Sequence, residues 1–497
     1  MSKQKSEFLF TGIVLQSATE VPIYRQLYEA LRQAILSRRL RPGQRLPPSR
    51  QLAETLGVSR TTVLLAFDHL FSEGYISGKS GSGTFVSATI PEHLLQVPAT
   101  AAPPAVVSVP QLSERGKHIC RISSGNARRQ QENLRPFRPG IPGLREFPYD
   151  IWNRLATRQI RSLHYEAFGY SDPAGYAPLR EAIAGYLRVA RAVNCEAEQV
   201  VIVNGSQQAL DLIARVLLDP GEAAWMEDPG YGGAKEALRA AGISLRAVPV
   251  DAVGLMVAEG IRRHPDARLA YVTPSHQYPL GVTMSLPRRL ELLEWAARAD
   301  AWIIEDDYDS EYRYAGRPIS SLQGLDRQGR VIYLGTFSKV LFPALRLGYL
   351  VVPPGLADAF IAAKAVSDRN CPLIEQAVAT SFITEGHFGR HLRRMRLLYQ
   401  ARQEALLEAG RKHLGGLLEM TPAETGLHLI GWLPEGADDR AISVRAEQAG
   451  IQVPPLSAYS LEEQQRPGLM LGYAAFDELL IEKSIRQLRR VLMPGMN

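Results

Sequence analysis

The stretch Tyr333-Leu-Gly-Thr-Phe-Ser-Lys339 decides the interpretation of most of this chain of 497 residues. The apolar run 331–334 predicts a buried strand that delivers polar side chains to its end. These side chains are Thr336, Ser338 and Lys339, with Arg346 seven residues after the lysine. Two hydroxyls, one amine and one guanidinium at this spacing suit a phosphate-bearing aldehyde. The amine can form a Schiff base, while the other groups hold the phosphate.

A second strand leads into a possible anion site. The run Val200 to Val203 predicts a buried strand, and a helical pattern begins after Asn204. The turn between them contains Gly205, Ser206 and Gln207. Backbone N–H groups at such a helix start can hold a phosphate, although the Gly-x-Gly-x-x-Gly spacing of dinucleotide sites is missing.

A third strand ends in a run of acids. The apolar residues 301–304 pass directly into Glu305-Asp-Asp-Tyr-Asp309, which is costly unless a cation lies nearby. A metal is one answer, but no histidine cluster or regular ligand spacing supports it. The other is a pyridinium nitrogen facing Asp306, with the Tyr308 phenol bonding the ring hydroxyl. Strand alternation would place Asp306 and Asp307 on opposite faces.

The N-terminal part of the chain is basic. Residues 1–90 hold eleven Lys and Arg against six acids, a charge of +5 out of +6 for the whole chain. A helix is expected from Pro22, a second one capped by Ser49 and ending at Gly57, and a third capped by Ser59. The third helix has Val63, Ala66, Phe67, Leu70 and Phe71 on its predicted inner face. Two strands, 75–77 and 84–86, are joined by a glycine-rich turn. The pattern predicts a winged helix-turn-helix for DNA, with a protein-binding module as the alternative.

Residues 22–87 resemble the winged helix-turn-helix of the GntR family of bacterial repressors. The resemblance rests on Arg45-Leu-Pro-Pro-Ser-Arg50, Leu56-Gly-Val-Ser-Arg60, Glu73-Gly-Tyr-Ile76 and the Gly81/Gly83 wing. It implies that double-stranded operator DNA is contacted by Arg50, Arg60 and the wing. The full predicted DNA-binding set is Arg45, Ser49, Arg50, Ser59, Arg60, Thr61, Thr62, Lys79, Gly81 and Gly83.

The remainder of the chain, from about residue 117, is similar to fold-type I pyridoxal-phosphate enzymes of the aspartate aminotransferase class. Ser206, Asp306, Tyr308, Lys339 and Arg346 match that class in order and spacing. The similarity implies an α/β fold with a large α/β domain and a smaller C-terminal α+β domain. It also implies pyridoxal 5′-phosphate on Lys339 as catalytic residue, and a head-to-tail homodimer in which Tyr170 reaches the partner's site. The predicted cofactor-binding set is Lys339, Asp306, Tyr308, Gly205, Ser206, Gln207, Thr336, Ser338, Arg346, Tyr231, His276 and Tyr170.

The two halves together resemble the MocR subfamily of transcriptional regulators. We expect a DNA-binding domain at 1–90, a Pro- and Ala-rich linker at 91–116, and an aminotransferase-like domain for PLP binding and dimerisation at 117–497. The resemblance implies a regulator that senses PLP itself or an amine or amino-acid effector, with at most residual transaminase activity. Two alternatives stay open: an active aminotransferase with an accessory DNA-binding domain, and a repressor whose body is a cofactor-free dimerisation platform.

Three positions depart from working transaminases. Tyr278 stands where an asparagine would bond the ring hydroxyl, and His276 or Gln277 can take over that bond. Met470 occupies the place of the arginine that clamps a substrate carboxylate, so Arg466 is the predicted effector-binding residue. Relatives that sense GABA are expected to have an arginine just after the tyrosine that matches Tyr231. Glycines follow Tyr231 here, which argues against GABA.

Cysteine content and hydropathy predict a cytoplasmic protein. The three cysteines are scattered, without metal or disulfide spacing. No run approaches the ~18 apolar residues of a membrane span, so no membrane partner is expected. A bacterial regulator of this kind would associate with the nucleoid when it binds DNA.

Overall fold

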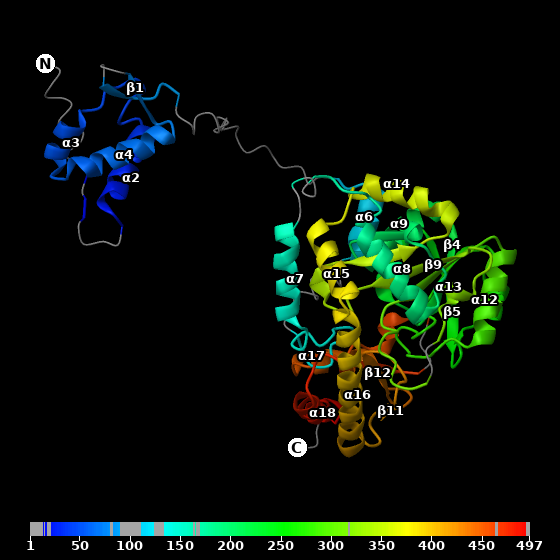
Figure 1. Cartoon of the computed structure of the whole chain (residues 1–497). Coiled ribbons are helices and arrows are strands. Elements are labelled where there is room, and N and C mark those ends of the chain that lie inside the picture. Colours follow the sequence, from blue (N-terminus) through cyan, green and yellow to red (C-terminus); the bar gives the residue numbers. More distant parts are fainter. Residues whose placement is uncertain are drawn as a thin grey trace. The chain divides into compact units, whose positions relative to one another are not determined.

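The protein divides into two compact units, Met1–Gln111 and Leu112–Asn497 (Figure 1). The computed structural model describes residues 13, 15–16, 21–79, 83–89, 111–123, 134–162, 165, 169–316, 319–462 and 466–493. Gly81 and residues 91–110 of the expected linker lie outside the described residues, and so does the side chain of Lys79. From the end of that linker, helix α6 (Glu114–Ser123) begins at residue 114 and packs on α10 (Gly232–Ala240).

The first unit is a winged helix-turn-helix. Its elements are α2 (Ile23–Leu36), α3 (Ser49–Leu56), α4 (Arg60–Ser72), β1 (Ile76–Lys79) and β2 (Gly83–Val86). Apolar side chains from all three helices and both strands meet in one small core, which includes Leu27, Leu31, Leu52, Val63 and Ile76. The two strands pair antiparallel, with Lys79 opposite Gly83, so they form the expected wing.

The cap of α4 agrees with the sequence, whereas the expected cap of α3 is wrong. The Thr62 backbone N–H donates to Ser59 Oγ at 3.1 Å, which makes Ser59 the N-cap of α4. Ser49 is instead the first residue of α3, and Pro48 precedes it with extended backbone and no side-chain cap. The Ser49 hydroxyl accepts a long hydrogen bond from Arg60 Nε at 3.4 Å.

Phe71 is a second correction in this unit. It was expected on the inner face of α4, but its side chain is 58% exposed. Its position after Leu70 turns it out of the core, where the ring lies beside Gly78 of the wing. The four other residues of the expected inner face are buried: Val63, Ala66, Phe67 and Leu70.

A mixed eight-stranded sheet forms the centre of the second unit, in the order β3-β10-β9-β8-β7-β4-β5-β6. Strands β9, β8, β7, β4 and β5 run parallel, while β10 is antiparallel to both of its neighbours. The bounds are β3 Val200–Val203, β4 Ala223–Asp228, β5 Ser244–Asp251, β6 Gly254–Leu255, β7 Ala267–Val272, β8 Trp302–Asp307, β9 Val331–Thr336 and β10 Gly348–Val351. The three strands predicted above at 200–203, 301–304 and 331–334 are present as β3, β8 and β9.

Helices cover both faces of this sheet because its strands are apolar on both sides. Val200 and Ile202 belong to a core that contains residues of α8 and α15, whereas Val201 and Val203 pack with residues of α9 and α14. The helices before the C-terminal part are α7 Tyr149–Ser162, α8 Ala177–Arg191, α9 Ser206–Leu217, α11 Val257–Arg263, α12 Leu286–Arg298, α13 Leu322–Leu325, α14 Ala357–Ser367 and α15 Leu373–Thr384.

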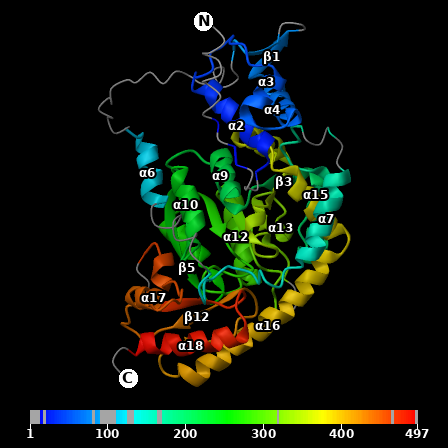
Figure 2. The same ribbon diagram turned by 90° about the vertical axis from the view of Figure 1, so that its left-hand side faces the viewer.

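The C-terminal part is smaller and has helices on an antiparallel sheet (Figure 2). The long helix α16 (His387–His413) leads into it, and α18 (Glu478–Leu492) packs against α16. Its three strands have the order β11-β12-β13, and α17 lies between the last two in sequence. Their bounds are β11 Glu419–Met420, β12 His428–Trp432, α17 Asp439–Gln448 and β13 Gly468–Gly472. The fold therefore has the large and small domains expected from the sequence.

None of the helices within the described residues combines the length and the apolar character needed to cross a bilayer.

Candidate functional site

Two neighbouring acids at the end of β8 point to different partners. Asp306 accepts a hydrogen bond from the Tyr271 hydroxyl at 2.7 Å. Asp307 instead forms an ion pair with Arg191 at 2.8 Å and accepts from the Tyr333 hydroxyl at 2.6 Å. Burial raises the pKa of Asp306 to about 7, and the bond from Tyr271 works in the opposite direction. Within the part of the chain that the structure describes, no guanidinium bonds to Asp306, so a cationic ligand atom could stabilise this buried carboxyl.

Lys339 lies just after β9, close to these acids. Its ammonium donates to the carbonyl of Gly140 at 2.7 Å. Burial lowers the pKa of Lys339, and the carboxylates of Asp309 and Asp306 offset part of this effect. A Cβ at Gly140, where φ is +71°, would lie 2.9 Å from Nζ. A desolvated lysine with a lowered pKa is more readily neutral, which is the form that attacks a carbonyl.

The predicted phosphate-binding groups are brought together at the ends of β3, β9 and β10. Arg346 donates to the backbone carbonyl of Asn204 at 2.9 Å. Gly205 has a φ of +91°, and a Cβ there would lie 3.1 Å from Arg346 Nη2, so glycine allows the close approach. Ser206 and Gln207 open α9, where the first N–H groups of the helix are available to an anion. The Thr336 hydroxyl accepts from the backbone N–H of Ser338 at 3.2 Å.

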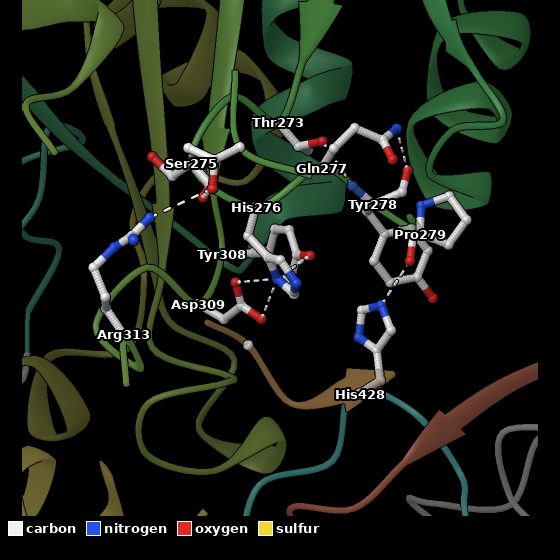
Figure 3. A network of polar contacts seen from close by, with 12 residues as sticks. Thr273, Ser275, His276, Gln277, Tyr278, Pro279, Tyr308, Asp309, Arg313 and His428 are labelled. Atoms are coloured by element: carbon white, nitrogen blue, oxygen red, sulfur yellow. Dashed lines mark hydrogen bonds and ion pairs between the residues drawn. The ribbon is translucent and has the colours of Figure 1, made fainter. Parts of the chain in front are cut away.

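His276 joins Tyr308 to a buried carboxylate (Figure 3). Its Nδ1 lies 3.0 and 3.1 Å from the two oxygens of Asp309 and 2.9 Å from the Tyr308 hydroxyl. Burial raises the pKa of Asp309, and the histidine opposes the change. Burial also keeps the pKa of Tyr308 well above its usual value, so the phenol retains its proton.

Gln277 and Tyr278 point elsewhere. The Gln277 amide donates to Pro229 O at 2.9 Å and to Glu227 Oε2 at 3.2 Å. Of the two side chains considered for the ring hydroxyl, His276 is therefore the one that contacts Tyr308. Tyr278 lies among aromatic rings and its hydroxyl is 3.6 Å from Met470 Sδ. Met470 itself is fully buried and offers no charge.

Three other predicted residues have separate surroundings. Tyr231 precedes α10 and its ring meets that of Tyr278 at 5.4 Å. Tyr170 is 85% exposed, with the Arg369 guanidinium 5.1 Å from its ring centre. Arg466 pairs with Glu419 and lies 4.9 Å over the ring of Trp432, on the small domain. These partners, Arg369, Glu419 and Trp432, do not belong to the residues predicted around Lys339.

The predicted DNA-binding residues lie around α3, α4 and the wing. Arg45, Arg50, Ser59, Arg60 and Thr61 are exposed. Ser49 and Thr62 are half-buried, and their hydroxyls bond to Arg60 and Ser59, respectively. The Arg45 side chain lies against Gly83, where an added Cβ would be 2.9 Å from Nε. Most of the set therefore faces solvent on one small fold.

The sequence did not identify four residues that build the Lys339 site. Tyr271 donates a hydrogen bond to Asp306, and Asp309 bonds to the ring of His276. The carbonyl of Gly140 accepts a hydrogen bond from Lys339. Gly426 has a φ of +99°, and a Cβ there would lie only 1.9 Å from His276 Cε1. Asp309 belongs to the acidic run already noted, so its burial could have been suspected. The other three come from distant segments, and only the fold reveals them.

Two family models match the chain and leave residues 1–22, 87–145 and 484–497 uncovered. Residues 23–86 match the bacterial regulatory proteins of the gntR family, and residues 146–483 match aminotransferase class I and II. The chain belongs to the transcriptional regulators that join a GntR-type DNA-binding domain to an aminotransferase-like domain, the MocR type.

Individual relatives match much of the chain. The probable rhizopine catabolism regulatory protein MocR of Rhizobium meliloti is 42% identical over 481 residues, covering 97% of this chain and 96% of that protein. The pyridoxine biosynthesis regulator PdxR of Corynebacterium glutamicum is 32% identical, with 93% of each chain covered. Among solved structures, the α-aminoadipate aminotransferase LysN of Thermus thermophilus has a TM-score of 0.70 and 31% identity, covering 76% of this chain and 96% of that one.

Proposed function

We propose that this protein is a PLP-dependent transcriptional regulator in which Lys339 carries the cofactor and an amine effector alters DNA binding. The observation that carries the proposal is a half-buried lysine, bonded to the Gly140 carbonyl, beside the buried carboxyls of Asp306 and Asp309. The structure of LysN in complex with a phosphopyridoxyl-leucine adduct supports the choice of cofactor. The aldehyde of PLP condenses with amines, and this is the chemistry that it would supply here.

The residues of the site fit this cofactor group by group. Arg346, with the N–H groups of Gly205 and Ser206, would hold the phosphate. Asp306 would face the pyridine nitrogen, because a buried carboxyl with a raised pKa gains most from a cationic partner. Thr336 ends β9 opposite Gly348, which lies two residues after Arg346, and Ser338 follows shortly after Thr336. Both hydroxyls would donate to the phosphate.

The Tyr308 phenol would bond the ring hydroxyl. One ring nitrogen of His276 faces both Asp309 and Tyr308, and it can make only one strong hydrogen bond along its lone pair or N–H. If Nδ1–H donates to Asp309, the Tyr308 proton is left for another acceptor. Such a proton suits the oxygen on the cofactor ring, so His276 and Asp309 would act by orienting Tyr308.

The effector is proposed to be an amine that competes with Lys339. Met470 is uncharged and buried against Tyr278, and Arg466 is engaged with Glu419 and Trp432. Neither contact supports an arginine clamp for a carboxylate at these positions. Amines without a carboxylate are therefore expected to perturb the cofactor spectrum more than α-amino acids of similar size.

Signal transfer requires a coupling between the two units. A coupling of about 1–3 kcal/mol between effector and DNA would change DNA affinity by about 5- to 150-fold. The family membership supports operator DNA as the partner, and the exposed residues around α3 and α4 would contact it. We also propose a head-to-tail homodimer, for which the exposed Tyr170 ring is available, and action in the cytoplasm at the nucleoid. Domain limits at 1–90 and 117–497 are part of the same proposal.

Borohydride reduction tests the cofactor assignment directly. After incubation with PLP and reduction, the peptide that contains Lys339 should gain a phosphopyridoxyl group by mass spectrometry. Lys339→Ala should abolish this label and the visible absorption. Lys235→Ala is the control, because Lys235 is a buried lysine, whose pKa burial lowers to about 8. A label that persists in Lys339→Ala but disappears in Lys235→Ala would refute the assignment. Steady turnover of an amine with a keto acid would instead favour a working aminotransferase.

A further inference from the structure

The exposed side of α7 carries a row of arginines that the functions above do not use. Arg154, Arg158 and Arg161 follow the i, i+4, i+7 spacing of one helical face, and all three are exposed. They line a shallow hollow of about 590 Å³. The remaining residues of its lining are uncharged hydrogen-bonding side chains: Asn153, Thr157 and Ser162.

The start of α16 extends this basic surface. Glu385 pairs with Arg158, and Arg390 donates to the Glu385 backbone carbonyl at 3.1 Å, which places the two guanidinium groups near each other. Arg394 reaches back to the carbonyl of Glu146, just before α7. Among the described residues, the acids close to this row are Glu385, Asp150 in the first turn of α7, and Glu146 just before it, which pairs with Arg402. Cations therefore outnumber acids on the surface formed by α7 and the beginning of α16.

The charge pattern favours a polyanion with closely spaced charges. The row from Arg154 to Arg161 spans roughly 10 Å along the helix. Duplex DNA presents one negative charge per ~1.7 Å of its axis, so several phosphates fit within that length. A helix face that only contacts solvent would explain one or two arginines. It would not explain why the residues that line this hollow include three arginines and no acid. DNA is favoured over an acidic protein because the same chain already binds a duplex, which raises the local concentration of phosphates.

We propose that the α7 face, defined by Arg154, Arg158 and Arg161, binds phosphates of the DNA that the winged helix holds. These contacts would be independent of base sequence, because arginines on phosphates position a duplex without reading it. They would raise the affinity of the whole chain above that of its DNA-binding domain. The proposal requires DNA binding by the winged helix, but it does not require PLP or an effector.

The test measures salt dependence with the full-length protein and a 60-base-pair duplex. Arg154→Gln/Arg161→Gln removes two charges and leaves the Arg158–Glu385 pair in place. If both arginines contact phosphates, the slope of log K against log salt becomes shallower by about 1.8, and the affinity at 0.1 M salt falls by about 60-fold. The control is Lys483→Gln/Arg490→Gln on the exposed side of α18, which changes the net charge equally and should leave the slope as in the wild type.

Three outcomes would overturn the proposal. The first is a wild-type slope in the α7 variant. The second is an equal loss in the α18 control, because net charge rather than this face would then be responsible. The third is a change in sedimentation without a change in slope, which would assign the face to contacts between copies of the chain. Arg154→Lys/Arg161→Lys keeps the charge and should restore the wild-type slope; failure of this rescue would indicate a structural effect.

Discussion

The winged helix and the Lys339 site use polar side chains in opposite ways. Around α3 and α4 the arginines and hydroxyls lie on the surface of a small apolar core, where they can meet a large partner. At the end of β8 and β9 the carboxyls of Asp306 and Asp309 are buried, Tyr308 and Lys339 lie half-buried beside them, and burial shifts the pKa values of this group. Such a site suits a small ligand, whose polar atoms can bond to the side chains in place of the water that these side chains lost on burial. Changes in the two regions should therefore appear in different measurements, DNA affinity for one and cofactor binding or stability for the other.

The largest expected effect separates two adjacent residues of the buried site. Asp307→Ala leaves Arg191 buried without its carboxylate, which should lower the free energy of unfolding by about 3–5 kcal/mol. Asp307 faces away from Asp306, so PLP affinity of the folded fraction should stay within about twofold. Urea unfolding and a PLP titration measure the two quantities. A large loss of PLP affinity with unchanged stability would show that Asp307, not Asp306, serves the cofactor.

Asp306→Asn should show the reverse pattern. It removes the negative charge proposed to face the pyridine nitrogen while keeping a group that can accept from Tyr271. PLP affinity should fall by about 10- to 100-fold, equivalent to about 1.4–2.7 kcal/mol, whereas stability without PLP should be kept or raised. Titration followed by visible absorption checks this. An unchanged affinity would remove Asp306 from the cofactor site.

Gly426→Ala should disturb the site through His276. The new Cβ would lie 1.9 Å from His276 Cε1, and the φ of +99° already disfavours a side chain. We expect a loss of about 2 kcal/mol in stability and an altered cofactor spectrum. Gly436→Ala is the matched control, because Gly436 has a φ of +79° and no atom within 4 Å of an added Cβ. Equal losses of stability in the two variants would show that the contact between Gly426 and His276 does not matter for the site.

The pH dependence of stability should come from the same buried acids. Burial raises the pKa of Asp306 and of Glu227 to about 7, above the values of about 4 in an unfolded chain. Between about pH 4 and 7 the folded protein therefore holds protons that the unfolded chain has released. Stability without PLP should fall as pH rises through this window, by up to about 1.4 kcal/mol per pH unit for each group.

Asp306→Asn should remove one such contribution. Unfolding free energies at pH 5, 6 and 7 would show a shallower slope in the variant, and PLP should flatten the wild-type slope in the same way. Identical slopes in both proteins would mean that Asp306 is ionised throughout this range.

The smallest expected effect concerns the winged helix. Ser59→Ala removes the cap of α4 and should destabilise this unit by about 1 kcal/mol. Ser49→Ala is the control, because Ser49 lies inside the first turn of α3 and caps nothing. Thermal unfolding, monitored by the circular dichroism signal of the helices, should show a lower stability for Ser59→Ala than for Ser49→Ala. A larger loss for Ser49→Ala would reverse the assignment of the caps.

Sequence patterns predict those features of the molecule that depend on residues close together in the chain. The strands that lead to Ser206, Asp306 and Lys339 can be predicted, because buried strands are apolar runs followed by polar residues. The opposite directions of Asp306 and Asp307 followed from strand alternation and are confirmed by their different partners. Ser49 was misassigned because a serine after two prolines resembles an N-cap, although Pro48 already supplies the extended residue.

Contacts between distant segments could not be predicted in this way. Gly140 accepts from Lys339 across 199 positions of sequence, and Gly426 faces His276 from the small domain. Neither glycine has a local signal that names its partner. The closeness of Arg466 to Met470 in the sequence predicts a role in effector binding, whereas in the structure its guanidinium contacts Glu419 and Trp432. Whether Arg466 takes part in effector binding stays a prediction.

The central claim is that occupancy of the Lys339 site alters the winged helix. The most direct measurement is DNA affinity of the PLP-loaded wild type and of Lys339→Ala, each titrated with a panel of amines on a duplex from the regulated promoter. The wild-type affinity should change by at least about fivefold with an effective amine, and the variant should not respond. An equal response in both proteins, or a response of the wild type without PLP, would contradict the account.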